Sequence, residues 1–188
     1  MEPVRRIVDG RRADTVQRLL DAALDEIREV AYGDLTVRTV AKRAEVSPAT
    51  AYTYFASKDH LISSVVWRQM QEVITSFGDG ASLSDVVGGI TAFFAEEPEL
   101  SRACTTALLA DDPEVARLRD EMTGAVARAF AGALGGVTRT TMDAVSMGFI
   151  GGMVLAGQGY LGFDEIAGRL TAIVEQLNPA PARRTRKR

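Results

Sequence analysis

Residues 36–61 read TVRTVAKRAEVSPATAYTYFASKDHL, and this stretch is the part of the sequence most informative about the fold. Thr36 and Ser47 each stand where a hydroxyl can cap the start of a short helix. Pro48 follows at the first helical position, where its missing N–H costs nothing. Because only three to four residues around Glu45 separate the two short helices, the stretch predicts a helix-turn-helix unit.

Each of these short helices has a small apolar face and a polar face. Small residues allow close packing, while hydroxyls and cations suit phosphate oxygens, and the Arg38 guanidinium also suits a guanine edge. In such a unit the second helix docks in the major groove of DNA and the first crosses the backbone. A solvated helical hairpin is the alternative, but three aromatic residues beside Lys58, in a chain with 6% aromatics, favour clamping of a nucleic-acid backbone. The polar face carries Arg38, Thr39, Lys42, Thr50, Tyr52, Thr53, Tyr54 and Lys58.

Over about residues 12–62 the chain resembles the TetR family of bacterial transcriptional regulators. That family has a first helix, then a helix-turn-helix, then an aromatic-rich segment that ends in lysine. The pattern is matched by Thr36-Val-Arg-Thr-Val-Ala41, Val46-Ser-Pro-Ala-Thr50 and Tyr52-Thr-Tyr-Phe55, followed by Lys58 and Leu61. The resemblance implies a three-helix DNA-binding domain, a C-terminal helical domain that binds a ligand and forms a homodimer, and a double-stranded DNA operator as partner.

The resemblance also implies which residues contact DNA. Thr50, Tyr52 and Lys58 would bind phosphates, and Arg38 would reach a base from the first helix of the pair. The base-facing set would be Pro48, Ala49, Thr53 and Tyr54, whereas Phe55 and Leu61 would belong to the core. Thr39 and Ser47 are further DNA-binding candidates.

Three residues depart from the family pattern. Glu45 stands where the family usually has glycine, and a left-handed backbone there would cost about 1 kcal/mol. Ala51 replaces a residue that is often a larger aliphatic, which predicts thinner packing under the second helix. Ala49 stands where glycine is frequent. These departures leave the fold prediction intact. They make it hard to transfer the family's base contacts to individual residues of this chain.

Outside this stretch, apolar residues recur at helical spacing, and no segment alternates in the manner of a strand. The sequence therefore predicts an all-α fold of about nine helices. We expect four parts: a flexible basic arm at 1–12, a helix-turn-helix domain at 13–57, a helical ligand-binding and dimerisation domain at 58–178, and a basic disordered tail at 179–188.

Charge is unevenly distributed over the 188 residues, whose formal net charge is −3. Residues 61–182 hold 7 basic and 15 acidic residues, whereas residues 36–58 hold 4 basic residues and 1 acidic residue. This pattern indicates a basic module on an acidic body, so the negative net charge of the whole chain does not exclude a nucleic-acid partner.

Both ends of the chain are rich in arginine. The N-terminal arginines would either reach the minor groove or, the favoured reading, add general electrostatic attraction from an exposed arm. Residues 183–188 are expected to be disordered, with non-specific attraction to DNA as the alternative. The N-terminal set is Arg5, Arg6, Arg11 and Arg12.

Several function classes are excluded by composition. One cysteine and one histidine leave no metal site of the Cys/His type and no Ser-His-Asp triad, so we expect neither a metal, a cofactor nor enzymatic activity. No apolar run approaches the length of a membrane span, and the N-terminus lacks the apolar core of a signal peptide. We expect a cytoplasmic protein without a membrane partner.

The segment 142–161 is apolar nearly all round and rich in glycine. Glycine lowers helix propensity by about 1 kcal/mol, so close contact between helices must compensate. Paired with the last helix, this segment predicts an isologous four-helix dimer interface, and the family resemblance implies the same place. The alternative is that the glycines only permit packing within one subunit. The interface candidates are Gly148, Gly152, Val154, Ile166, Leu170, Ile173 and Leu177.

Bulky soft side chains at helical spacing are candidates for a ligand pocket in the body, although such residues also fill ordinary cores. Few buried charges are expected, which favours an apolar or amphipathic effector. Cys104 is expected to be buried core, with a redox sensor as the alternative. The pocket candidates are Trp67, Met70, Phe93, Cys104, Met122, Phe130 and Phe149.

These observations favour a DNA-binding repressor that a small molecule releases. The alternative is a helical protein of the same fold that acts through a protein partner, or as a small-molecule binder, without specific DNA recognition.

Overall fold

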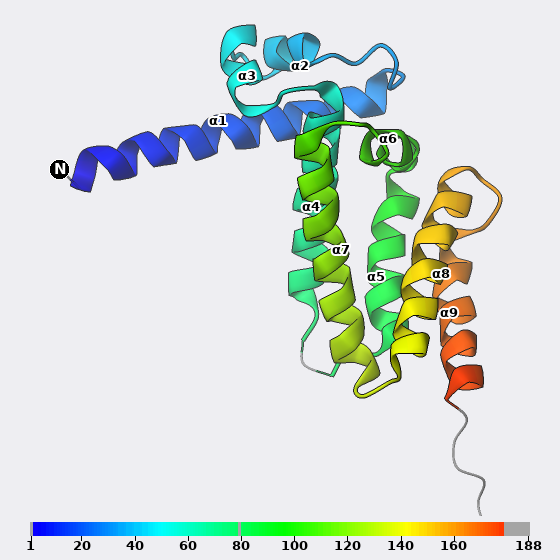
Figure 1. The fold of residues 1–188 in the computed structure, drawn as a ribbon. Coiled ribbons are helices and arrows are strands. Elements are labelled where there is room, and N and C mark those ends of the chain that lie inside the picture. The colour runs from blue at the N-terminus through cyan, green and yellow to red at the C-terminus, as the bar shows by residue number, and fades with distance from the viewer. Residues whose placement is uncertain (1, 79, 179–188) are drawn as a thin grey trace, which may run out of the picture.

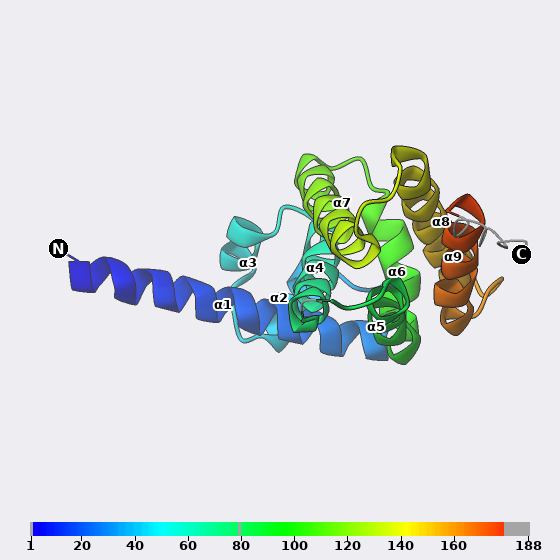
Figure 2. The same cartoon turned by 90° about the horizontal axis from the view of Figure 1, so that it is seen from below.

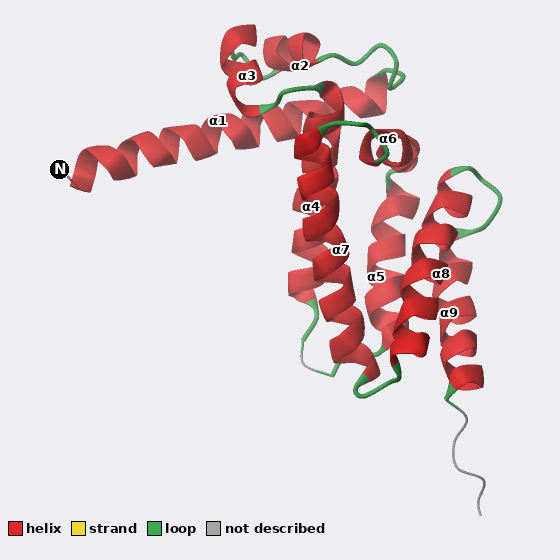
Figure 3. Cartoon of the chain, viewed as in Figure 1, coloured by secondary structure: helices red, strands yellow, loops and turns green. Residues whose placement is uncertain are grey.

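The structure is a computed structural model that describes residues 2–78 and 80–178, with side chains from residue 12 onward. Within these ranges helices joined by loops make up the fold, and no strand occurs (Figure 3). The predicted all-α class is confirmed, as is the predicted number of about nine helices. The helices are α1 (Glu2–Glu29), α2 (Val37–Arg43), α3 (Pro48–Tyr54), α4 (Lys58–Ser76), α5 (Leu83–Glu96), α6 (Pro98–Leu108), α7 (Pro113–Leu134), α8 (Arg139–Gly157) and α9 (Phe163–Leu177).

The helix ends follow from local sequence signals. The hydroxyls of Thr36, Ser47 and Ser57 each accept a hydrogen bond from the backbone N–H three residues later, at 3.0, 3.1 and 3.0 Å. Pro48 stands in the first turn of α3. Gly135 ends α7 with a φ of +64°, which glycine adopts without steric cost.

The nine helices form a small N-terminal head and a larger body. In the head, α2 packs against α1 and α3 packs against α2, and α1 runs across one end of the body (Figure 1). In the body, α4, α5, α7, α8 and α9 run roughly alongside one another, and α6 lies across their head-side end (Figure 1). Figure 2 shows α8 and α9 at the side of the body that lies far from the free end of α1. One continuous cluster of buried apolar side chains runs through head and body.

Polar links fasten α1 to the body. The Arg68 guanidinium of α4 lies 2.6 Å from an Asp21 carboxylate oxygen and 3.0 Å from the Gln17 amide oxygen. Arg28 donates to Glu97, the residue that precedes α6, at 3.0 Å. The head is therefore held both by the shared core and by these pairs.

The structure describes the N-terminal arm as part of a helix but does not describe the C-terminal tail. Helix α1 begins at Glu2, so it includes the residues for which we expected a flexible arm, and its N-terminal half extends away from the other helices (Figures 1 and 2). A role for that arm on DNA stays a prediction. The predicted basic tail, 179–188, lies outside the described residues. None of the described helices is long and apolar enough to span a membrane.

Candidate nucleic-acid interface and ligand cavity

The turn between α2 and α3 is a Schellman motif with glutamate at the position that glycine usually occupies. Glu45 has a φ of +55°, the one positive value among the described non-glycine residues. Its N–H donates to the Lys42 carbonyl at 3.2 Å, and the N–H of Val46 donates to the Ala41 carbonyl at 2.9 Å. These are the two hydrogen bonds that define the motif. The left-handed backbone considered for Glu45 from sequence is therefore present.

This turn sets α3 on the head with one face buried and one exposed. Ala51 and Phe55 point inward, at 0% and 4% exposure, so the predicted core role of Phe55 is confirmed. Leu61 of α4 is also fully buried, as expected. The exposed face carries Ser47, Pro48, Ala49, Thr50, Tyr52 and Thr53.

The exposed face of α3 offers hydroxyl groups and one aromatic ring. Tyr52 is 48% exposed. The Thr50 and Ser47 hydroxyl oxygens lie 2.8 Å apart at the N-terminus of the helix, and the Thr53 hydroxyl donates to the Ala49 carbonyl at 3.0 Å. These groups suit phosphate and base-edge contacts.

Two residues of the predicted DNA-binding set, Tyr54 and Lys58, contact other side chains and backbone groups of the head instead of pointing freely into solvent. Tyr54 is half-buried and packs against the core. The Lys58 ammonium donates to the Tyr32 carbonyl at 3.0 Å and lies 4.5 Å from the centroid of the Tyr32 ring. Since an ammonium has three donors, one bond to Tyr32 leaves others for a phosphate. The Tyr32 hydroxyl in turn donates to Asp59. Nothing local in the sequence indicated Tyr32, which lies 26 residues before Lys58.

Helix α2 presents cations beside α3. Arg38 and Lys42, four residues apart on one helix face, are exposed and have no carboxylate partner among the described residues. Arg43 instead pairs with Glu29 and Glu26 of α1. Exposed Thr39 closes a reciprocal capping box with Thr36. The free positive charge of the helix-turn-helix therefore lies on the solvent side of α2.

A hydrogen bond between two helix caps joins the start of α4, which follows the helix-turn-helix, to the start of α7. The Ser57 hydroxyl, the N-cap of α4, donates to a carboxylate oxygen of Asp112, the N-cap of α7, at 2.6 Å. This bond lowers the pKa of Asp112 below its ordinary value. His60 in the same turn accepts the Ala56 N–H at 3.3 Å through Nδ1, and burial lowers its pKa.

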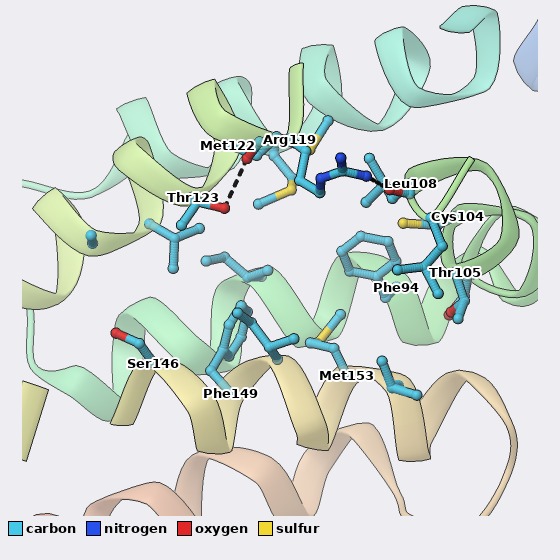
Figure 4. A pocket seen from close by; sticks show the side chains of 18 residues that line it. Phe94, Cys104, Thr105, Leu108, Arg119, Met122, Thr123, Ser146, Phe149 and Met153 are labelled. Atoms are coloured by element: carbon cyan, nitrogen blue, oxygen red, sulfur yellow. Dashed lines mark hydrogen bonds between the residues drawn. The ribbon is translucent and has the colours of Figure 1, made fainter. Parts of the chain in front are cut away.

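The body contains a cavity of about 270 Å³ between α4, α5, α6, α7 and α8 (Figure 4). Of the seven candidates from sequence, Met70, Cys104, Met122 and Phe149 line it. The other three do not: Trp67 and Phe93 are half-buried against the core, and Phe130 is fully buried behind Phe149, with ring centroids 5.3 Å apart. The full lining is Met70, Ile90, Phe94, Ser101, Cys104, Thr105, Leu108, Leu109, Arg119, Met122, Thr123, Val126, Ala127, Ser146, Phe149, Ile150, Met153 and Val154.

The residues missed from sequence share helix faces with those that were found. Arg119, Thr123 and Val126 lie on the same stripe of α7 as Met122, at spacings of three and four residues. The most important residue that the sequence-based candidates lacked is Arg119, because it brings a positive charge into a lining that we expected to be apolar. Burial raises the pKa of the Cys104 thiol to about 12, which fits the predicted buried residue and gives no thiolate for redox sensing at neutral pH.

Most of the predicted dimer residues lie in a contact within the chain. A Cβ on Gly148 would lie 2.8 Å from the Leu170 side chain, and one on Gly152 would lie 3.3 Å from Ile166. Ile166 and Leu170 are each 2% exposed, and Ile173 is half-buried. These five residues were expected at a dimer interface, but the geometry fits the alternative, in which the glycines let α9 approach α8 in one subunit.

Away from α9, helix α8 exposes apolar side chains, and two of these, Ile150 and Val154, also line the rim of the cavity. Met147, Ile150 and Val154 are 68%, 55% and 40% exposed, and Leu155, which is nearer to α9 around the helix, is 49% exposed. Val154 and Leu177, the two remaining interface candidates, are exposed at 40% and 44%, and their place in a dimer interface stays a prediction. We call Met147, Ile150, Val154 and Leu155 the outer α8 face.

No group of three or more potential metal ligands gathers in the described part of the chain. The site consists of an exposed helix-turn-helix surface, a cavity in the acidic helical body, and a hydrogen bond between the starts of α4 and α7.

Comparison with known proteins agrees with this arrangement. Residues 19–65 match the family model of bacterial regulatory proteins of the tetR family. An uncharacterised HTH-type transcriptional regulator of Mycobacterium tuberculosis is 40% identical over 171 residues, which is 87% of this chain and 80% of that protein. The HTH-type transcriptional repressor KstR of Rhodococcus jostii is 31% identical over 63% of this chain and 58% of its own length.

The fold itself is found in a TetR transcriptional regulator from Rhodococcus sp. RHA1. That structure superposes with a TM-score of 0.73 at 22% identity, and the match covers 87% of this chain and 96% of the other. Similarity therefore extends from the helix-turn-helix through the helical body, and the chain belongs to the TetR family of bacterial transcriptional regulators.

Proposed function

We propose that this regulator is a repressor that binds a palindromic operator as a homodimer and is released when a small molecule with an apolar part occupies the cavity of the body. The observation that carries the proposal is the exposed face of α3, where Thr50, Tyr52 and Thr53 point to solvent while Ala51 is fully buried. A soluble protein without a partner has no need for such an aromatic and hydroxyl surface beside unpaired cations.

The charge distribution supports DNA as the partner of this face. Arg38 and Lys42 on α2 lack carboxylate partners among the described residues, whereas the body carries 15 acidic residues between 61 and 182. Such a distribution attracts a polyanion to the head and repels it from the body, which orients the encounter. Phosphate contacts would position α3, and Arg38 with the α3 face would read base edges.

A homodimer would double the small surface of one head. A single helix-turn-helix buries too little area for selective binding, and two heads read two half-sites of a palindrome. The outer α8 face supports a second copy as its cover, since a contiguous exposed apolar patch on a soluble protein marks an interaction site. An isologous contact would bring α8 against α8 across a two-fold axis. The KstR relatives, which are named repressors, support repression over activation.

Release requires a connection from the cavity to the head. Arg119, which lines the cavity, donates to the Leu108 carbonyl at the end of α6 at 2.5 Å. Asp112, the N-cap of α7, accepts a hydrogen bond from Ser57 at the start of α4. A ligand that shifts α6 and α7 would therefore displace the N-terminus of α4, next to the helix-turn-helix. The coupling needed is about 1–3 kcal/mol, within reach of one or two such hydrogen bonds.

Fluorescence anisotropy tests DNA binding. The chain is titrated into duplex DNA from upstream of its own gene and into a scrambled duplex of equal length, between about 50 and 200 mM salt. We expect tight, salt-steep binding to one palindromic segment and binding at least about 1000-fold weaker to the scrambled duplex. Equal affinity for both duplexes would refute the proposal and favour a protein that works without specific DNA recognition.

Sedimentation equilibrium tests the dimer. Ile150→Glu places a charge in the centre of the outer α8 face and should yield monomers. Ala131→Glu, on an exposed position of α7, is the matched control and should leave the dimer intact. A wild-type chain that is monomeric at micromolar concentration, or an unaffected Ile150→Glu dimer, would contradict this interface.

A further inference from the structure

The cavity contains a charge that the fold itself leaves without a counter-ion. Among the described residues that line it, Arg119 is the one charged residue. Its guanidinium donates to the Leu108 carbonyl at 2.5 Å, and no carboxylate of the described chain lies within 4.0 Å of it. Figure 4 shows the guanidinium on the α6 side of the cavity, near Leu108 and Cys104.

Other arginines show that this is unusual for the chain. Arg68, the other half-buried arginine of the described residues, lies 2.6 Å from the Asp21 carboxylate. Arginines without a carboxylate partner elsewhere, such as Arg38 and Arg128, are exposed to water. Since a guanidinium stays charged in proteins and its charge is costly to remove from water, a half-buried arginine is normally paired.

The side chains around Arg119 indicate what the uncharged part of a ligand in this cavity must be like. Phe94, Met122, Phe149 and Met153 form an apolar channel that leads away from the guanidinium toward Ser146 at the opposite side of the cavity (Figure 4). Thr105, which lies three residues before Leu108 on α6, adds a hydroxyl to the lining. One cation with a few hydroxyls compensates a single negative charge and not a phosphate dianion.

We propose that the effector is a monocarboxylate with an elongated apolar body, whose carboxylate pairs with Arg119 and whose body lies between Phe94, Met122 and Phe149. This inference rests on the proposed ligand-responsive function and narrows it to one ligand class. A carboxylate matches the planar fork of a guanidinium with two parallel hydrogen bonds. Pairing would also compete with the bond from Arg119 to Leu108, so ligand entry acts on the link between α6 and α7.

The test uses the full chain, isothermal titration calorimetry and four probes of one length, each below its micelle concentration: decanoate, methyl decanoate, decan-1-ol and decylammonium. Decanoate should bind about tenfold or more tightly than the ester and the alcohol, and decylammonium should bind least. Shortening decanoate to octanoate should cost about fourfold per methylene. Because these comparisons use the wild-type chain, they do not depend on a variant that folds.

A variant pair then assigns the contact. Arg119→Gln should lower decanoate affinity about tenfold or more and leave decan-1-ol affinity unchanged. Arg117→Gln, on an exposed arginine of the same helix that pairs with Glu114 and Glu121, is the matched control and should bind decanoate as the wild type does. Equal affinities for decanoate and its methyl ester, tighter binding of decylammonium, or no binding of any probe would overturn the proposal.

Release of DNA is measured separately, by adding decanoate to the preformed protein–DNA complex. A chain that binds DNA selectively yet shows no preference for the carboxylate would refute this ligand class and leave the regulator intact. A chain that prefers decanoate but binds no DNA selectively would support the ligand class and refute the repressor.

Discussion

Replacing Glu45 by glycine should stabilise the protein. Glu45 holds a left-handed backbone in the turn between α2 and α3, and its exposed side chain has no hydrogen bond or ion pair within the described chain. A left-handed conformation costs an L-residue about 1–2 kcal/mol, which glycine avoids. Glycine also gains about 0.4–1 kcal/mol of entropy in the unfolded chain, which offsets part of this. The net expectation is a gain of about 0.5–1 kcal/mol.

Thermal unfolding followed by circular dichroism at 222 nm measures this gain. For a chain of this length, 1 kcal/mol corresponds to about 2–4 °C in Tm, so Glu45→Gly should raise Tm by about 1–4 °C. Both proteins are compared at one concentration, because dimerisation would make Tm depend on concentration.

Gln71→Gly provides the matched control. Gln71 is exposed in the interior of α4, where the backbone is right-handed, so the same mutation to glycine should lower stability by about 1 kcal/mol. Opposite signs for the two variants would confirm strain at Glu45. A fall in Tm for Glu45→Gly similar to that of Gln71→Gly would refute the reasoning.

Three further outcomes follow from the contacts described above. Ser57→Ala removes the cap of α4 and the bond to Asp112, and urea unfolding should show a loss of about 1–3 kcal/mol. Because Ser57 lowers the folded-state pKa of Asp112, this carboxylate stabilises the fold above its unfolded pKa near 4, and the contribution is lost as pH falls through the lower folded value. Stability of Ser57→Ala should therefore fall less steeply below about pH 4 than that of the wild type, and equal slopes would contradict the link. Gly148→Ala should stabilise the protein less than Gly132→Ala does, because a Cβ at position 148 would lie 2.8 Å from the side chain of an α9 leucine. A Cβ at position 132 meets open space, so the full gain in helix propensity of about 1 kcal/mol is available there. Equal gains in Tm for the two variants would show that α9 does not pack closely on α8 at Gly148. Cys104, whose pKa burial raises to about 12, should resist iodoacetamide at pH 8 in the native protein and react rapidly in urea, and fast native alkylation would contradict its burial.

Helix boundaries could be predicted because the signals for them are local. The caps at Thr36, Ser47 and Ser57 each bond a backbone group three residues away, so sequence spacing alone specifies them. The exposed and buried faces of α3 follow in the same way from helical periodicity.

Contacts between distant helices could not be predicted in this way. Gly148 is a small residue in an apolar helix, and the sequence does not say whether α9 of the same chain or a second copy fills the space beside it. Lys58 was expected to be free for phosphate, but Tyr32 lies near it only because α1 ends where α4 begins. Arg119 faces the cavity rather than solvent because α6 and α7 cross at that level.

On this model of the regulator, the solvent face of α2 and α3 reads DNA. Competition between the palindromic duplex and a scrambled duplex, measured by anisotropy for Arg38→Ala and for Arg139→Ala on the exposed start of α8, tests it most directly. We predict that Arg38→Ala weakens operator binding by about 1–3 kcal/mol and reduces the preference over the scrambled duplex, while Arg139→Ala behaves as the wild type. Arg38→Ala with wild-type affinity and selectivity would contradict the account.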